Sequence, residues 1–318
     1  MAYTAGDSIL DDEYNDFVGS SSSPFGYNHF AGTGSGEYGL NQTSIATVSA
    51  GGTINASSWN SLFTGLDNIA NHTNVSITSS SVSAGDAIAV RSALISDLAS
   101  LAAAVAAGST SATAISTPAA AGSSSNSATW NSTSTIERSI TFANSATMRA
   151  FFNAGGYIRI DPSCTTGIDG SKDDVFNDLT TTAIGNLDLK AHITSRSGSG
   201  ETLTTDGLAN GFHELSTGYT VLLKLTSDNS GYTSNTVEIS AKLDAAPATA
   251  TVLTIKMVST DPADDNTYTA GNTDGVPANP DEAPIMVLAL LEAYPTDAQG
   301  LAADIRAASN AEVSNSPS

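Results

Sequence analysis

Apolar residues at helical spacing dominate residues 51–107. Ser57 or Ser58 can cap a helix whose apolar positions recur every three or four residues. These positions are Trp59, Leu62, Phe63, Leu66 and Ile69. A second helix is expected over Ala84–Ala107, where near-heptad spacing fits an antiparallel helical hairpin at least as well as an intermolecular coiled coil.

The segment 139–160 combines two different apolar periods. Ile140 and Phe142 alternate with polar residues, as in a half-buried strand. Asn144 or Ser145 can cap a short helix with an apolar face, and Gly155–Gly156 supplies the backbone freedom that ends helices. Tyr157, Ile158 and Ile160 then resume a strand, so the pattern predicts strand, helix, glycine turn and strand.

Period-two alternation governs most of the remaining chain. Strands are predicted over 219–226, 235–243, 250–259 and 284–294, and the last is apolar on both faces and therefore central or at an interface. A helix is predicted over 173–189, a short strand over 191–195, and a weak helix with a frayed tail over 301–318.

Together these elements predict an α+β fold with a boundary inside a low-complexity stretch. Residues 1–50 read as an extended docking arm, 51–107 as a helical region and 108–135 as a Ser/Ala/Thr-rich linker. Residues 136–294 read as a mainly antiparallel, β-sandwich-like domain, and 295–318 as a C-terminal tail.

Composition narrows the classes of partner. The 318 residues include 32 acidic and 11 basic ones, which gives a formal net charge of -21. Nucleic-acid binding needs clustered cations, and an anionic surface is repelled by acidic lipid, so neither nucleic acid nor a membrane is an expected partner. The single cysteine, Cys164, cannot form an intrachain disulfide and has few basic neighbours that would activate it. No N-terminal signal peptide and no apolar run of spanning length is visible.

The candidate chemical motifs are incomplete. Gly34–Gly39 has the letters of a dinucleotide fingerprint but not its strand and helix, and His213-Glu214 lacks the second zinc-binding histidine. The acidic stretch Asp261–Asp274 lacks the EF-hand order, although it leaves a different calcium site open. We therefore expect no enzyme activity, no cofactor, no catalytic residue and no defined metal site.

Several stretches, in order, resemble virion structural proteins of tailed bacteriophages. They are Ile9–Asn15, Gly32–Gly39, Gly52–Leu62, Phe151–Arg159 and the run from Tyr219 to Ile255. The resemblance covers about half of the chain and implies a structural component of a virion, associated with the tail, neck or baseplate and assembled in the bacterial cytoplasm. Its partners would be other virion proteins and copies of itself in a homo-oligomer.

Such a function depends on subunit interfaces, and aromatic residues of the arm are the candidate anchors. They are Tyr14, Phe17, Phe25, Tyr27, Phe30, Tyr38 and Trp59. The alternative is that these side chains fill the core of their own chain. Two other functions stay open: a capsid decoration protein, and a fibre that binds a receptor or host-surface glycan, for which Tyr232 and Tyr268 are the obvious exposed aromatics.

Overall fold

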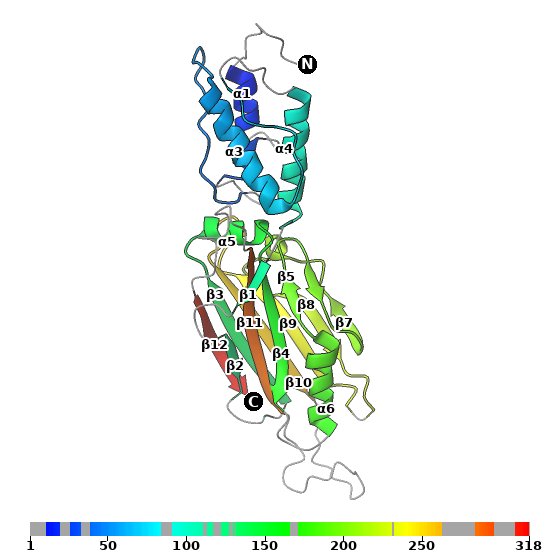
Figure 1. The fold of residues 1–318 in the computed structure, drawn as a ribbon. Coiled ribbons are helices and arrows are strands. Elements are labelled where there is room, and N and C mark those ends of the chain that lie inside the picture. Colours follow the sequence, from blue (N-terminus) through cyan, green and yellow to red (C-terminus); the bar gives the residue numbers. More distant parts are fainter. Residues whose placement is uncertain are drawn as a thin grey trace, which may run out of the picture. The chain divides into compact units, whose positions relative to one another are not determined.

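The fold is α+β and divides into two compact units (Figure 1). The computed structural model describes residues 11–19, 26–32, 39–83, 91–110, 113–116, 122–126, 130, 132–165, 171–230, 232–262, 284–295 and 309–317. The helical unit comprises Met1–Ala114, Asn144–Gly156 and Tyr294–Arg306. The β unit comprises Ile115–Ala143, Tyr157–Ala293 and Ala307–Ser318.

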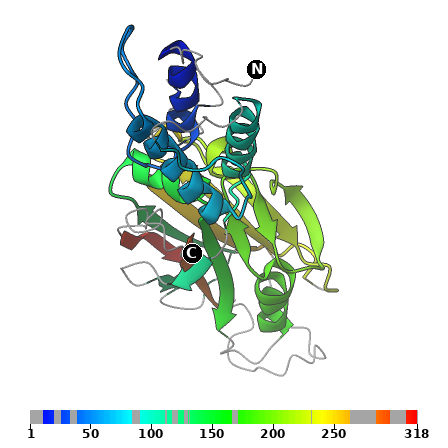
Figure 2. The same ribbon diagram turned by 45° about the horizontal axis from the view of Figure 1, so that its top comes forward.

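The helical unit contains helices of different lengths. They are α1 (Asp11–Val18), α2 (Tyr27–Phe30), α3 (Ala56–Thr73), α4 (Arg91–Ala106) and α5 (Ser145–Asn153). The long helices α3 and α4 lie beside each other (Figure 2). Asn55 caps α3 by accepting a hydrogen bond from the Ser58 amide, and Asn74 ends it in the left-handed conformation.

The β unit is built from two sheets that face each other (Figure 1). The first has the strand order β1-β11-β4-β5-β6, with β2 also paired to β11. Its strands are β1 (Thr113–Ser116), β2 (Ser123–Ser125), β4 (Tyr157–Thr165), β5 (Leu187–Leu189), β6 (Thr194–Arg196) and β11 (Ile285–Pro295). The central place of β11 explains its long apolar run.

The second sheet has the order β12-β3-β10-β9-β8-β7. Its strands are β3 (Ser132–Thr141), β7 (Thr202–Asp206), β8 (Thr220–Thr226), β9 (Thr236–Leu243), β10 (Val252–Asp261) and β12 (Ser309–Pro317). The three predicted strands at 219–259 are therefore confirmed as the meander β8–β9–β10. The unit also holds α6 (Ser171–Asn177), a π-helical turn at Asp178–Ile184 and a 3-10 turn at Phe212–Glu214.

The strand–helix–strand prediction at 139–160 is confirmed, but its helix is part of the helical unit and not of the β unit. Asn144 caps α5 by accepting from the Thr147 amide, and Gly155 takes a φ of 85° in the turn before β4. However, α5 belongs to the helical unit, whereas β3 and β4 belong to the β unit. The His72 Nε2 atom lies 3.0 Å from the Ala154 carbonyl, which ties α5 to α3.

Three other expectations are corrected. The linker at 108–135 contributes β1, β2 and the start of β3, because a strand ladder needs backbone groups and not apolar side chains. The helix predicted to reach residue 189 ends at Ile184, since Gly185 adopts a positive φ and Leu187 begins β5. In the C-terminal tail, Ser309–Pro317 forms the edge strand β12 against β3.

Candidate functional site

The described candidate anchors lie in the core of the helical unit. Tyr14, Phe17, Tyr27, Phe30 and Trp59 are each no more than 5% exposed. The Tyr14 ring meets the Trp59 ring edge-on with centroids 5.3 Å apart, and the Tyr14 hydroxyl donates to the Ser58 carbonyl. These side chains fill their own core, as the alternative expectation held. Of the described residues among 1–50, Asp11–Val18 and Tyr27–Phe30 form the helices α1 and α2, whereas 39–49 is neither helix nor strand.

Phe25 and Tyr38, the other two candidate anchors, lie outside the described residues. So does Tyr268, whereas Tyr232 lies half-buried in the turn between β8 and β9. The fingerprint glycines at 34 and 36 and most of the acidic stretch 261–274 also lie outside them.

Two asparagines fasten the segment 39–49, which is neither helix nor strand, to the helices. The Asn28 side chain donates to the Ile45 carbonyl and accepts from the Ile45 amide, both at 2.8 Å. Asn15 forms the same pair of bonds with Val48, again at 2.8 Å. An amide side chain can bond to one backbone N–H and one backbone C=O at once. Each asparagine therefore makes the pair of hydrogen bonds that a neighbouring strand would make in a sheet.

The same device recurs on the segment 75–83. Asn60 on α3 donates to the Val82 carbonyl at 2.9 Å and accepts from the Val82 amide at 2.8 Å. The buried Asp97 carboxylate on α4 accepts from the amides of Thr78 and Ser79. Polar side chains that are unremarkable in the sequence therefore place two non-helical segments on the helices.

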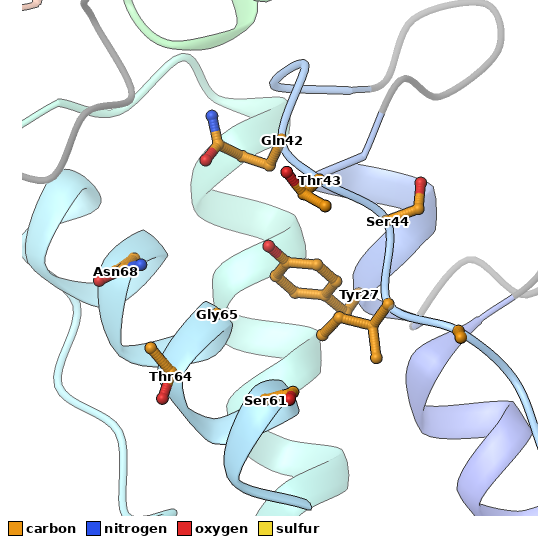
Figure 3. Close-up of a pocket in the computed structure, with 10 residues that line it drawn as sticks. Tyr27, Gln42, Thr43, Ser44, Ser61, Thr64, Gly65 and Asn68 are labelled. Atoms are coloured by element: carbon orange, nitrogen blue, oxygen red, sulfur yellow. The ribbon is translucent and has the colours of Figure 1, made fainter. Parts of the chain in front are cut away.

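A pocket of about 430 Å³ opens between the segment 39–49 and α3 (Figure 3). The segment, α2 and α3 all contribute to its lining. The lining residues are Tyr27, Gln42, Thr43, Ser44, Ile45, Ala46, Ser61, Thr64, Gly65 and Asn68. Its described lining consists mainly of hydroxyl and amide groups around one aromatic ring, and none of these described residues carries a carboxylate, ammonium or guanidinium group.

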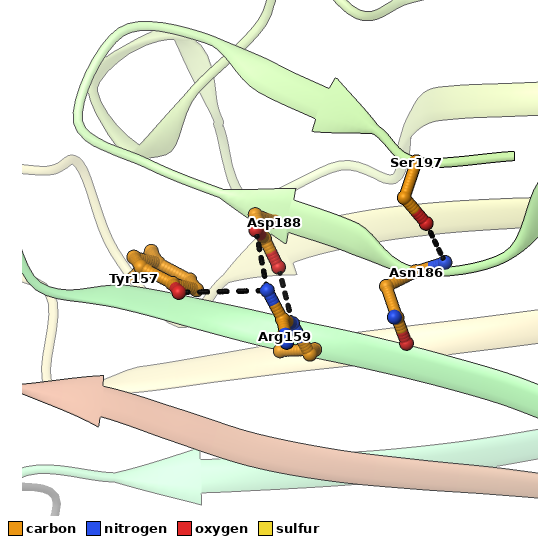
Figure 4. Close-up of polar contacts among 5 residues, drawn as sticks. All are labelled: Tyr157, Arg159, Asn186, Asp188 and Ser197. Carbon is orange, nitrogen blue, oxygen red and sulfur yellow. Dashed lines mark hydrogen bonds and ion pairs between the residues drawn. The ribbon is translucent and has the colours of Figure 1, made fainter. Parts of the chain in front are cut away.

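In the β unit, the first sheet carries a polar cluster around Tyr157 (Figure 4). The Arg159 guanidinium donates to both carboxylate oxygens of Asp188, at 2.7 and 2.9 Å, from the neighbouring strand. This hydrogen bonding raises the pKa of Arg159 despite the opposing effect of burial. Arg159 and the Lys190 ammonium also lie over the Tyr157 ring, 5.6 and 5.9 Å from its centroid.

The second sheet has a similar cluster around Tyr219. The ammonium groups of Lys242 and Lys256 lie 4.4 and 3.8 Å from the centroid of its ring. Burial, and then the nearby Glu137 carboxylate, raise the pKa of the Tyr219 phenol. Four of the chain's 11 basic side chains thus stack on two tyrosines.

Two histidines that are distant in sequence meet in the β unit. The rings of His192 and His213 stack with centroids 4.7 Å apart, and His192 Nδ1 lies 3.1 Å from Glu214. Glu214 also accepts from the Gly211 amide and closes the 3-10 turn. Because His192 and His213 are far apart in the sequence, no local sequence pattern predicts that their rings stack.

The described residues offer little that points to catalysis or metal binding. Within them, no group of three or more His, Cys, Asp or Glu side chains is placed to hold a metal ion. Asp261 is buried 2.9 Å from the Lys172 ammonium, in an ion pair between α6 and β10. Burial, reinforced by the charge of Asp173, raises the pKa of the Cys164 thiol to about 11 and makes it a poor nucleophile. No helix in the described parts is long and apolar enough to span a bilayer.

The molecule is thus an α+β protein that joins a helical unit to an antiparallel two-sheet unit. Searches against protein-family profiles, curated proteins and solved structures find no match to this chain. Its functional assignment therefore rests on the residues and their arrangement.

Proposed function

We propose that this protein is a structural component of a tailed-phage virion, associated with the tail, neck or baseplate and acting through subunit interfaces. The ordered set of sequence motifs supports this role, because it resembles proteins of that class. The assignment implies a virion location and partnership with other virion proteins and further copies of this chain.

The observation that carries the proposal is that the motif residues serve architecture and not chemistry. Trp59, in the motif Gly52–Leu62, is buried against Tyr14 and Phe63. In Phe151–Arg159, the two phenylalanines are fully buried and Gly155 makes the turn into β4. The run Tyr219–Ile255 forms the β8–β9–β10 meander. Motifs that specify packing and turns suit an assembly protein, whose function is the surface that its fold presents.

The test is to locate the chain in particles of a phage whose genome encodes it. Mass spectrometry of purified particles should find the protein, and electron microscopy with antibody labelling should place it at the tail, neck or baseplate. Copy numbers in multiples of three, six or twelve are expected there. Hundreds of copies on the head would instead identify a capsid decoration protein, and absence from complete particles would refute both roles.

A glycan-binding role is the second candidate, and the uncharged pocket of the helical unit favours it. This role is compatible with a virion location but does not depend on it.

A further inference from the structure

The pocket beside α3 is lined by the hydroxyl group of Tyr27, which has no hydrogen-bond partner among the residues that the structure describes. Tyr27 is 5% exposed, and no hydrogen bond to its hydroxyl is formed by any residue in the described ranges. Burial raises the pKa of this phenol, so it is neutral at physiological pH. Figure 3 shows the hydroxyl directed into the space between Gln42 and Asn68.

Other side chains around the pocket are also available to a ligand. Thr43, Ser44, Thr64 and Asn68 make no side-chain hydrogen bond to any other residue that the structure describes. By contrast, the Ser61 hydroxyl already donates to a carbonyl one helical turn earlier. The free groups are three hydroxyls and one carboxamide, which can each donate and accept.

The shape of the pocket depends on Gly65. A Cβ atom at this position would lie 2.7 Å from the Tyr27 ring, so the missing side chain allows the ring to pack directly on α3. The ring is joined in the lining by Ile45 and Ala46, which supply apolar contact beside the polar groups.

The lining also excludes most charged ligands. Among the lining residues that the structure describes, there is no basic group to neutralise an anion and no carboxylate to neutralise a cation. Burying an unpaired ion is far more costly than burying a hydroxyl. The ligand must therefore be uncharged, rich in hydroxyl groups and partly apolar. A volume of about 430 Å³ is within the usual range of small-ligand pockets, roughly 300–1,000 Å³.

We propose that this pocket binds a neutral carbohydrate, one or two pyranose units in size. The apolar face of the sugar lies on Ile45 and Ala46, and its hydroxyl groups bond to the Tyr27 hydroxyl, Thr64, Asn68 and the segment 42–46. The inference rests on the pocket alone and is independent of the proposed virion role.

The experiment measures binding of neutral saccharides to the full chain by saturation-transfer NMR and calorimetry. The probes are methyl glycosides and disaccharides of glucose, galactose, mannose and N-acetylglucosamine, with glucuronic acid and a Ser/Thr-rich peptide for comparison. At least one neutral saccharide should bind, and more tightly than either comparison ligand. The absence of binding by every neutral saccharide at millimolar concentration would overturn the proposal, as would tighter binding of the acid or the peptide.

Variants then connect binding to the pocket. Tyr27→Phe should weaken binding about fivefold, the effect of losing one hydrogen bond. Thr64→Trp places an indole at the exposed rim and should abolish binding. The controls are Tyr14→Phe, at a buried tyrosine outside the pocket, and Asn71→Trp, at an exposed α3 position outside it. Unchanged binding in a folded Thr64→Trp variant, or equal losses in the controls, would refute the assignment.

Discussion

The Asn28 side chain holds the segment 39–49 by two hydrogen bonds, and its removal should loosen that segment locally. Both bonds to Ile45 are 2.8 Å long. A typical hydrogen bond contributes about 1 kcal/mol net, so Asn28→Ala should lower the free energy of local opening by about 2 kcal/mol. This corresponds to a roughly 30-fold larger opening constant. Native-state hydrogen exchange at the Ile45 amide measures it directly.

An isosteric variant separates the two bonds. In Asn28→Asp the carboxylate can still accept from the Ile45 amide, but it faces the Ile45 carbonyl without a proton to donate. Folding therefore favours the protonated carboxyl and raises its pKa above the unfolded value of about 3.9. The stability of the variant relative to the wild type should be fully regained below that unfolded value. It should be lost as pH rises through the folded pKa.

The matched control is Asn71→Ala, because Asn71 is exposed and makes only a 3.4 Å bond to Asp67. It should leave exchange at Ile45 unchanged. If Asn28→Ala also leaves the Ile45 amide as protected as in the wild type, the two bonds do not hold the segment and the reasoning fails.

Three further predictions concern single positions. Gly155→Ala should lower the free energy of unfolding by at least about 2 kcal/mol in chemical denaturation, because the φ of Gly155 is 85° and a Cβ would lie 2.5 Å from the Gly108 carbonyl oxygen. The control Gly51→Ala, also at positive φ but with no atom within 4 Å of the added Cβ, should lower it by only about 1 kcal/mol. Cys164, with its pKa raised to about 11, should react with a disulfide reagent at pH 8 more than about 100-fold slower than after unfolding, and equal rates would contradict its burial. At Asp244, burial raises the pKa, but hydrogen bonds from the Val252 and Thr251 amides and the Thr251 hydroxyl outweigh it, so that the pKa is lowered on folding. The ionised Asp244 carboxylate therefore stabilises the fold above pH about 4, and this stabilisation is lost as pH falls through the folded pKa. Asp244→Asn should therefore be less stable than the wild type only above that range, by less than about 1 kcal/mol because the side chain is exposed, and a constant difference down to pH 2 would contradict this.

Elements with a buried face could be predicted from the chain alone. The helix around Trp59, the strands β8, β9 and β10, and the cap at Asn144 all follow from local periodicity and capping chemistry. The polar edge strands could not be predicted in this way. All residues of β7 are exposed, and β12 is formed by a polar run at the end of the chain. Edge strands gain their ladder bonds from a neighbour, so their own side chains carry little signal.

The candidate sites depended still more on the tertiary structure. The aromatic residues of the first 60 positions were recognised in the sequence, but only the fold decided that Tyr14 and Trp59 pack on each other. The pocket joins α2, the segment 42–46 and α3, which no local pattern brings together. The stacking of His192 on His213 is likewise a product of the chain's path.

By itself, the sequence determined the fold class, the main buried strands and helices and the excess of negative charge, because periodicity and composition are local or additive properties. Only the tertiary structure decided which polar groups acquire partners and which do not. The hydrogen bonds of Asn28 and the unpartnered hydroxyl of Tyr27 illustrate the difference. Asn28 and Tyr27 are neighbouring polar residues on one short helix. Only their surroundings in three dimensions decide that Asn28 holds a segment of the chain, whereas the Tyr27 hydroxyl faces a pocket.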